Sequence, residues 1–191
     1  MKKITLLIIS VFLAVQTINA QVVLDTNGIT VKWTGTLVPS PSYFIQANPR
    51  GTGMEWFAIV DNTTKSNITN YAKNIPSGIT YFTPPSSTAP IPFDNIVTTL
   101  VTATNNLFNQ AVTFNQPIGS WDVNNVTNMS SMFNQAVTFN QPIGSWDVSN
   151  VTDMSSMFDN ANAFNQSISS WNVGNVTNMF RLFFNAFAFN Q

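Results

Sequence analysis

The chain has 191 residues with 7 Lys and Arg, 8 Asp and Glu, no Cys and no His, and its formal net charge is −1. The lack of Cys excludes disulfides, and the lack of both residue types removes the commonest general base, the thiolate nucleophile and the usual zinc ligands. No basic cluster exists to neutralise phosphates, which argues against a nucleic-acid partner. We therefore predict a protein that is not an enzyme, with no catalytic, cofactor-binding or metal-binding residues.

The first twenty residues have the pattern of a secretory signal peptide. Lys2 and Lys3 precede an apolar run at residues 4–15, and the small residue Ala20 precedes Gln21. The alternative, a membrane anchor, needs roughly 20 apolar residues, and this run is too short. We expect cleavage after Ala20, no membrane span in the remaining chain, and a secreted or cell-surface location.

Residues 21–83 are not repetitive and read as a β-rich N-terminal region. Strands are expected at residues 22–24 and 29–33, on either side of Asn27-Gly28, a dipeptide that favours a tight hairpin turn. Aromatic and β-branched residues predict further strands at 55–60 and 79–83. Ser66 is a candidate N-cap for a short helix through Lys73. The four prolines of residues 84–92 predict a stiff connector.

From residue 93 the chain follows a 25-residue period, which is typical of arrays of stacked units. Trp121, Trp146 and Trp171 are 25 residues apart, and units 108–132 and 133–157 are identical at 23 of 25 positions. The period defines a degenerate first coil at 93–107, repeats at 108–132, 133–157 and 158–182, and a partial repeat at 183–191. We expect one repeat domain over residues 93–191.

Within each unit the apolar spacing predicts a strand followed by a helix. Trp146 and Val148 alternate with polar residues, as in a strand with one buried face. Thr152 is a candidate N-cap, and apolar residues at 154, 157, 158 and 161 have the spacing of one helix face. The predicted fold is therefore an α/β, leucine-rich-repeat-like solenoid of 25-residue strand–helix coils with a parallel sheet, preceded by the small β-rich region.

The string FNQPIGSWDVSNVTDMSSMF at 139–158 resembles the repeat of BspA-like bacterial surface proteins, a divergent branch of the leucine-rich repeats. The spacing of Ile143, Trp146, Val148 and Val151 is similar to the leucine-rich-repeat core, although Val151 takes the place of the usual Asn. The resemblance covers about half of the chain. It implies a secreted or cell-surface bacterial protein, often adhesive, without enzyme activity.

Strand positions that point away from the expected core form one polar strip, our candidate binding site. Two of its members, Asp122 and Asp147, occupy equivalent positions on neighbouring coils. They could bind a cation, share a proton or hydrolyse a glycosidic bond. Alternatively, they are exposed, screened residues copied by duplication, which Asn172 in the third coil favours. The strip contains Ser120, Asp122, Asn124, Ser145, Asp147, Ser149, Ser170 and Asn172.

A second polar series recurs with the period, because Asn115, Asn140, Asn165 and Asn190 are each followed by Gln. These amides could form a rail for a polar ligand. The alternative, which we favour, is a stack of buried amides that closes the turn of each coil.

These features together predict a repeat protein for adhesion to, or recognition of, an extracellular protein or glycan, without cofactors. A structural spacer and, with less support, a carbohydrate-active domain are the alternatives. The final unit is unusually aromatic, with Phe180 and Phe187 at positions that are Ser, Val or Asn in other coils. We expect an array cut within a repeat and self-association through its open C-terminal end.

Overall fold

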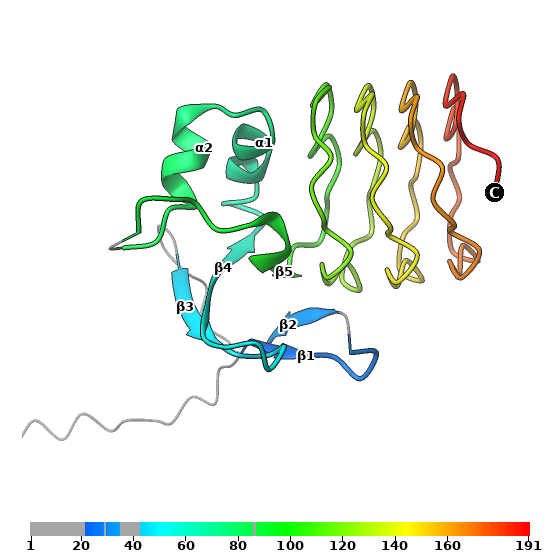
Figure 1. Cartoon of the computed structure of the whole chain (residues 1–191). Helices are drawn as coiled ribbons and strands as arrows, with labels where there is room; N and C mark the ends of the chain where they lie inside the picture. The colour runs from blue at the N-terminus through cyan, green and yellow to red at the C-terminus, as the bar shows by residue number, and fades with distance from the viewer. Residues whose placement is uncertain (1–21, 29, 35–42, 86) are drawn as a thin grey trace, which may run out of the picture.

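The computed structural model describes residues 22–28, 30–34, 43–85 and 87–191 (Figure 1). The expected signal peptide at 1–20 lies outside these residues. No helix within the described ranges is long and apolar enough to cross a membrane.

The chain enters the described structure in a small antiparallel hairpin. Strand β1 (Val22–Leu24) pairs with β2 (Val31–Trp33), with Val23 opposite Lys32. The connection turns at Gly28, whose φ is +69°, and the Asn27 side chain accepts a hydrogen bond from the Thr30 backbone N–H at 2.9 Å. The hairpin predicted around Asn27-Gly28 is confirmed, although β2 begins two residues later than expected.

A second sheet holds the rest of the N-terminal region. Its strand order is β3 (Tyr43–Ala47), β4 (Glu55–Asp61) and β5 (Ile96–Leu100), with β3 antiparallel and β5 parallel to β4. Parallel neighbours need a crossover connection. Helices α1 (Ser66–Ala72) and α2 (Pro76–Tyr81), followed by the short 3-10 helix η1 (Phe93–Asn95), lie in that connection.

Two expectations for this region change. The strand predicted at 79–83 is wrong, because α2 occupies most of that segment with Pro76 in its first turn, where a missing N–H costs nothing. The helix predicted from Ser66 to Lys73 is confirmed to within one residue, but Ser66 is not its N-cap. The approach to the helix is fixed instead by Asp61, whose carboxylate accepts hydrogen bonds from the backbone N–H groups of Thr63 and Thr64, both at 2.9 Å. These bonds lower the pKa of Asp61, although burial alone would raise it.

The repeats form narrow coils that stand side by side (Figure 1). Parallel bridges join Ala103 to Asn128, Asn128 to Asp153, and Asp153 to Asn178, so each coil lies in register with the next after 25 residues. We refer to residues 101–191 as the stack. Its period and register follow the sequence repeat.

The predicted fold class, an α/β leucine-rich-repeat-like solenoid of strand–helix coils, is wrong. The last helix or strand of the described chain ends at Leu100, and the coils are built from turns and single bridges. The expected helix around Met154 is interrupted by Ser156, whose φ is +54°, and Asn160, whose φ is +56°, both in the left-handed region. The regular elements are two small sheets, two short α-helices and the 3-10 helix η1, so the described fold is mainly β.

Backbone hydrogen bonding explains why a helical apolar pattern does not produce a helix here. The N–H groups of Ser156 and Phe158 donate to Phe180 and Leu182 of the following coil, at 2.8 and 2.9 Å. A helix would direct these groups to carbonyls four residues earlier in the same coil. The next coil supplies a carbonyl acceptor for each of these N–H groups. The coils can therefore stack while their backbone groups stay hydrogen-bonded.

Columns of aromatic rings form the core of the stack. Phe133, Phe158 and Phe183 lie nearly parallel, with ring centroids 5.5 and 5.4 Å apart. Trp146 and Trp171 stack in the same way at 6.5 Å. The repeat positions predicted to face the core, among them Met154 and Phe158, are buried. Each coil therefore completes the apolar face of its neighbour.

Candidate functional site

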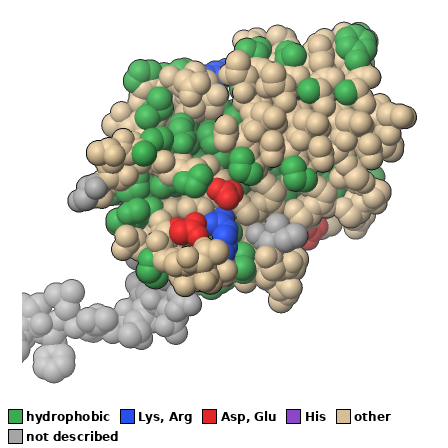
Figure 2. Space-filling model, in the orientation of Figure 1, with side chains coloured by type: hydrophobic (Ala, Val, Ile, Leu, Met, Phe, Trp, Pro, Cys, Tyr) green, Lys and Arg blue, Asp and Glu red, His purple; other side chains and the backbone are tan. Residues whose placement is uncertain are grey.

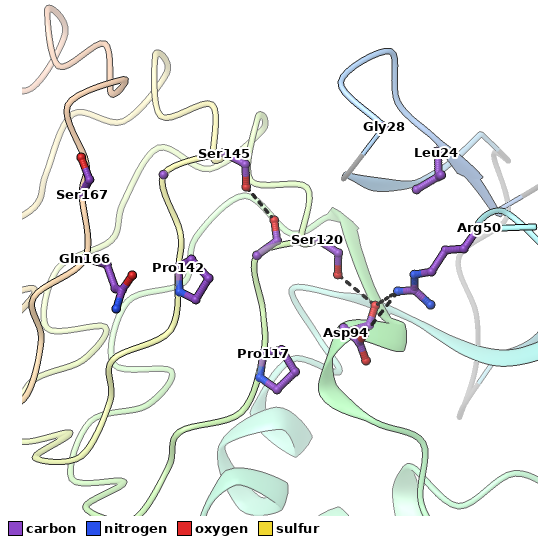
Figure 3. A pocket seen from close by; sticks show the side chains of 12 residues that line it. Leu24, Gly28, Arg50, Asp94, Pro117, Ser120, Pro142, Ser145, Gln166 and Ser167 are labelled. Atoms are coloured by element: carbon purple, nitrogen blue, oxygen red, sulfur yellow. Dashed lines mark hydrogen bonds and ion pairs between the residues drawn. The ribbon is translucent and has the colours of Figure 1, made fainter. Parts of the chain in front are cut away.

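An open groove of about 750 Å³ runs between the β1–β2 hairpin and one side of the stack (Figure 3). Successive coils contribute equivalent residues to its lining, so the groove follows the direction of stacking. We call it the serine–proline groove. It is lined by Leu24, Gly28, Arg50, Asp94, Pro117, Gly119, Ser120, Pro142, Gly144, Ser145, Gln166 and Ser167.

Serine hydroxyls fasten the coils to each other along the groove. Ser120 Oγ donates to the Asp94 carbonyl at 3.0 Å, and Ser145 Oγ donates to the Gly119 carbonyl at 2.9 Å. Each oxygen can still accept a hydrogen bond from a ligand. Pro117 and Pro142 are exposed beside them and add apolar ring faces. The part of the lining that the coils supply is therefore neutral and combines hydrogen-bonding with apolar surface.

Close approach of the coils explains the two glycines of the groove. A Cβ atom at Gly119 would lie 2.8 Å from the Pro142 carbonyl oxygen, and one at Gly144 would lie 2.8 Å from that of Ser167. Both obstacles are backbone atoms that cannot rotate away. The equivalent position in the third coil is Ser169, and no further coil of the described chain lies against it. At this repeat position, glycine occurs in the two coils whose following coil approaches closely, and serine occurs in the third.

One end of the groove carries charge. Arg50 donates to Glu55 Oε2 at 2.9 Å and to the Asp94 carbonyl at 2.8 Å. Hydrogen bonds from Thr52 and Asn95, together with Arg50, lower the pKa of Glu55. Figure 2 shows acidic and basic side chains gathered beside the N-terminal region, whereas little of the stack visible on this face is charged.

The hairpin divides the predicted polar strip. Ser120 lines the serine–proline groove, whereas Asp122, Asn124 and Asp147 line a second hollow of about 60 Å³, and Ser145 borders both. The division arises because β2 lies on the first coils: Val31 bridges to Trp121, and its N–H donates to the Ser120 carbonyl at 2.8 Å. The expectation that the strip is exposed throughout is wrong at Asp122, which is only 4% exposed.

Lys32 lies in the small hollow beside Asp122 and Asp147, the two residues that the sequence suggested as a catalytic or cation-binding pair. Its ammonium forms an ion pair with Asp25 at 2.9 Å. That hydrogen bond, together with the charges of Asp122 and Asp147, raises the pKa of Lys32. The aspartates therefore already face a cation supplied by the chain. This arrangement favours a structural role over cation binding or hydrolysis.

The remaining strip residues form local turns. Asp147 Oδ1 accepts from the Ser149 N–H, and Asn172 Oδ1 accepts from the Gly174 N–H, both at 3.1 Å. The Ser149 carbonyl accepts a hydrogen bond from the side-chain amide of Asn175 in the next coil, at 2.6 Å. Ser170 Oγ donates to the Gly144 carbonyl. These residues lie on the surface in sequence register, but their polar atoms largely serve the stack itself.

The asparagine–glutamine series forms a ladder, as favoured from the sequence, but it lies at the surface and not in the core. Asn140 Oδ1 accepts from the Asn165 backbone N–H and from Gln166 Nε2, both at 2.9 Å. Asn115 and Asn165 accept equivalent bonds from the coils that follow them. The ladder joins the turns of neighbouring coils.

Sequence reasoning missed the prolines and glycines of the groove as potential binding residues. Pro117 and Pro142 were given no binding role from the sequence, although they recur with the 25-residue period and so lie on one face of the stack. Arg50 and Asp94 gave no such signal. They reach the groove through the β3–β4 connection and η1, whose packing on the first coil follows from tertiary structure.

No curated protein and no solved structure matches the chain. The family described as Mycoplasma protein of unknown function, DUF285, matches residues 80–191. That match includes the whole stack and more than half of the chain, and the protein therefore belongs to this family.

Proposed function

We propose that this protein is a non-enzymatic, secreted or cell-surface recognition protein that binds an extracellular protein or glycan in the serine–proline groove. The observation that carries the proposal is the repetition of equivalent groove residues, Pro117 with Pro142 and Ser120 with Ser145, on successive coils. A linear ligand would meet the same chemistry at each step. The signal-peptide pattern and the resemblance to BspA-like surface proteins support the location and the adhesive role.

The chemistry of the groove suits binding better than catalysis. Its two acidic neighbours, Asp94 and Glu55, are both engaged by Arg50, so neither is poised as a general acid or base. The hydroxyl and carbonyl groups along the coils are neutral and fixed by the stacking. Such preformed polar groups beside apolar ring faces hold a ligand in a defined orientation without ordering the protein first.

The proposal is tested by blocking the groove. The mature chain would be applied to an array of glycans and extracellular-matrix proteins, and each positive ligand would be titrated against two variants. Ser167→Trp places a bulky side chain at the lining, whereas Val137→Trp adds the same side chain at an exposed position of the stack outside the groove. We expect Ser167→Trp to weaken binding at least about tenfold and Val137→Trp to leave it unchanged.

A third variant distinguishes the groove from the polar strip. Asp147 and Asn172 are exposed and lie outside the groove lining, so Asp147→Lys with Asn172→Lys changes the charge of the strip alone. Loss of binding in this variant, with full binding by a folded Ser167→Trp protein, would place the site on the strip and overturn the groove assignment.

A further inference from the structure

The chain supplies its own example of an extended segment bound to the side of the stack. Strand β2 lies on the coil that contains Trp121, where the Val31 N–H donates to the Ser120 carbonyl at 2.8 Å and Val31 forms a parallel bridge with Trp121. The next residue of β2, Lys32, lines the small hollow together with Asp122. This coil therefore holds an extended segment through a backbone donor and lies beside its basic side chain.

The following coil carries the same groups, but the hairpin does not cover them. Ser145 and Asp147 are the repeat counterparts of Ser120 and Asp122. No hydrogen bond from the described residues reaches the Ser145 carbonyl. Asp147 is exposed, whereas Asp122 is only 4% exposed under β2. Parallel bridges join this coil to a neighbour on each side, so these groups lie along the side of the stack and not at one of its ends.

These groups are continuous with the serine–proline groove. Ser145 borders both the groove and the hollow that contains Lys32 and Asp147. Figure 3 shows Ser120 and Ser145 on neighbouring coils beside the hairpin. A ligand that lies in the groove therefore meets Ser145, and from there one of its side chains can reach Asp147.

Hydrogen-bonding capacity along the coils calls for a ligand that brings donors. Ser120 Oγ and Ser145 Oγ donate their protons to the Asp94 and Gly119 carbonyls, so toward a ligand both hydroxyls are acceptors, as is the Ser145 carbonyl. Backbone N–H groups of an extended polypeptide supply such donors. None of the described residues that line the groove is aromatic, so a sugar ring has no aromatic face on which to stack.

Charge near the groove favours a basic ligand. The small hollow is lined by three carboxylates and one ammonium, that of Lys32, which leaves a net charge of −2. Arg50, at one end of the groove, forms ion pairs with Glu55 and Asp94 at 2.9 and 3.7 Å, and these three groups leave a net charge of −1. Complementary charge steers association and selects among ligands.

We infer that the ligand of the serine–proline groove is an extended polypeptide with a basic side chain, an assignment that rests on the proposed function. One backbone N–H of the ligand donates to the Ser145 carbonyl, as β2 donates to the preceding coil, and a Lys or Arg side chain lies beside Asp147. Pairing of an added segment with free backbone groups is a recurring mode of peptide recognition. The backbone bond positions the basic side chain, which the carboxylates alone would not do.

Labelled peptides test the inference on the mature chain. The probe has the sequence of residues 28–35, which includes β2, and its counterpart carries Lys32→Glu. We expect saturable binding of the probe by fluorescence anisotropy, weaker binding as the salt concentration is raised, and at least about tenfold weaker binding of the counterpart. Ser167→Trp in the protein is expected to weaken the probe at least about tenfold, and the neutral sugar chitohexaose is expected not to compete with it.

Two protein variants locate the basic side chain, and each introduces a residue that another repeat already carries. Asp147→Asn removes the exposed charge and keeps the local turn, because Asn172 accepts the equivalent backbone bond in the following coil. The matched control is Asp153→Asn, which removes the same charge outside both the groove and the hollow, at a position where Asn128 accepts the equivalent bond. We expect Asp147→Asn to weaken the probe about fivefold and Asp153→Asn to leave its binding unchanged.

The outcomes separate this inference from the proposed function. Chitohexaose binding that Ser167→Trp blocks, with no binding of the probe at millimolar concentration, would overturn the inference and leave the groove as the binding site. Equal affinity for the two peptides, or equal affinity of the two Asn variants for the probe, would also overturn it. Binding of the probe that Ser167→Trp leaves intact would contradict both the inference and the assignment of the groove.

Discussion

The N-terminal region and the stack satisfy the same backbone requirement by different means. Between Val22 and Leu100, the described strands and helices pair their N–H and carbonyl groups within sheets and helical turns, whereas the stack has no regular element and pairs each coil with its neighbour. Ser131, for example, donates to the Ser155 carbonyl at 2.8 Å, as short as a bond within a sheet. A repeated sequence can therefore dispense with helix and strand, because each unit presents its neighbour with a complementary edge.

The two regions also differ in the side-chain contacts that hold them together. The N-terminal region relies in part on ion pairs such as Lys32 with Asp25 and Arg50 with Glu55. Within the stack, columns of parallel aromatic rings run from coil to coil. If this contrast is correct, damage to a column should cost the most stability and damage to surface bonds the least.

The largest effect is expected from breaking a column. Phe158 is fully buried between Phe133 and Phe183, so Phe158→Ala leaves a cavity and is expected to lower the free energy of unfolding by about 3–5 kcal/mol. The control is Phe187→Ala in the last coil, where the ring is 79% exposed and little should change. Chemical denaturation followed by tryptophan fluorescence measures both. Similar losses in the two variants would show that the columns do not carry the stability of the stack.

The sequence alone was sufficient for the period, the buried positions and the stacking. Trp146, Met154 and Phe158 were assigned to the core from their spacing, and all three are buried. The hairpin at Asn27-Gly28 and strand β4 were also predictable, because their local preferences agree with the final structure. Where a local pattern and the tertiary structure coincide, sequence reasoning was reliable.

It failed where the tertiary structure overrides the local pattern. The spacing of Met154, Met157 and Phe158 fits a helix face, yet the neighbouring coil takes their N–H groups and Ser156 adopts a left-handed conformation. Nothing in the residue type serine predicts this left-handed conformation. The cover that β2 places over Asp122 is also invisible in the sequence, because it depends on how the hairpin packs on the first coils. Of the eight residues of the candidate strip, only Ser120 and Ser145 line the groove.

A smaller effect is expected from separating two coils at their closest approach. A Cβ atom at Gly144 would lie 2.8 Å from the Ser167 carbonyl oxygen, so Gly144→Ala forces the backbone apart and should cost roughly 1–3 kcal/mol. The control is Gly174→Ala, where the nearest atom is the flexible Asn172 side chain at 3.2 Å. Thermal unfolding of both variants compares them. A Gly144→Ala protein as stable as the control would mean that the coils can separate there without cost.

The smallest effect is expected from the asparagine ladder, because its bonds lie at the surface, where water can replace them. Asn140→Ala removes the acceptor of the Asn165 N–H and of Gln166 Nε2, so it should cost about 0.5–1.5 kcal/mol. Asn190 holds the equivalent position in the last coil, and no further coil of the described chain donates to its side chain. Asn190→Ala should therefore leave the free energy of unfolding unchanged in the same denaturation experiment. The difference between these two asparagines isolates the contribution of the neighbouring coil, since residue type and position in the repeat are identical. Equal losses would show that the amide acts within its own coil, and the account of the stack as mutually completing units would then fail at this turn.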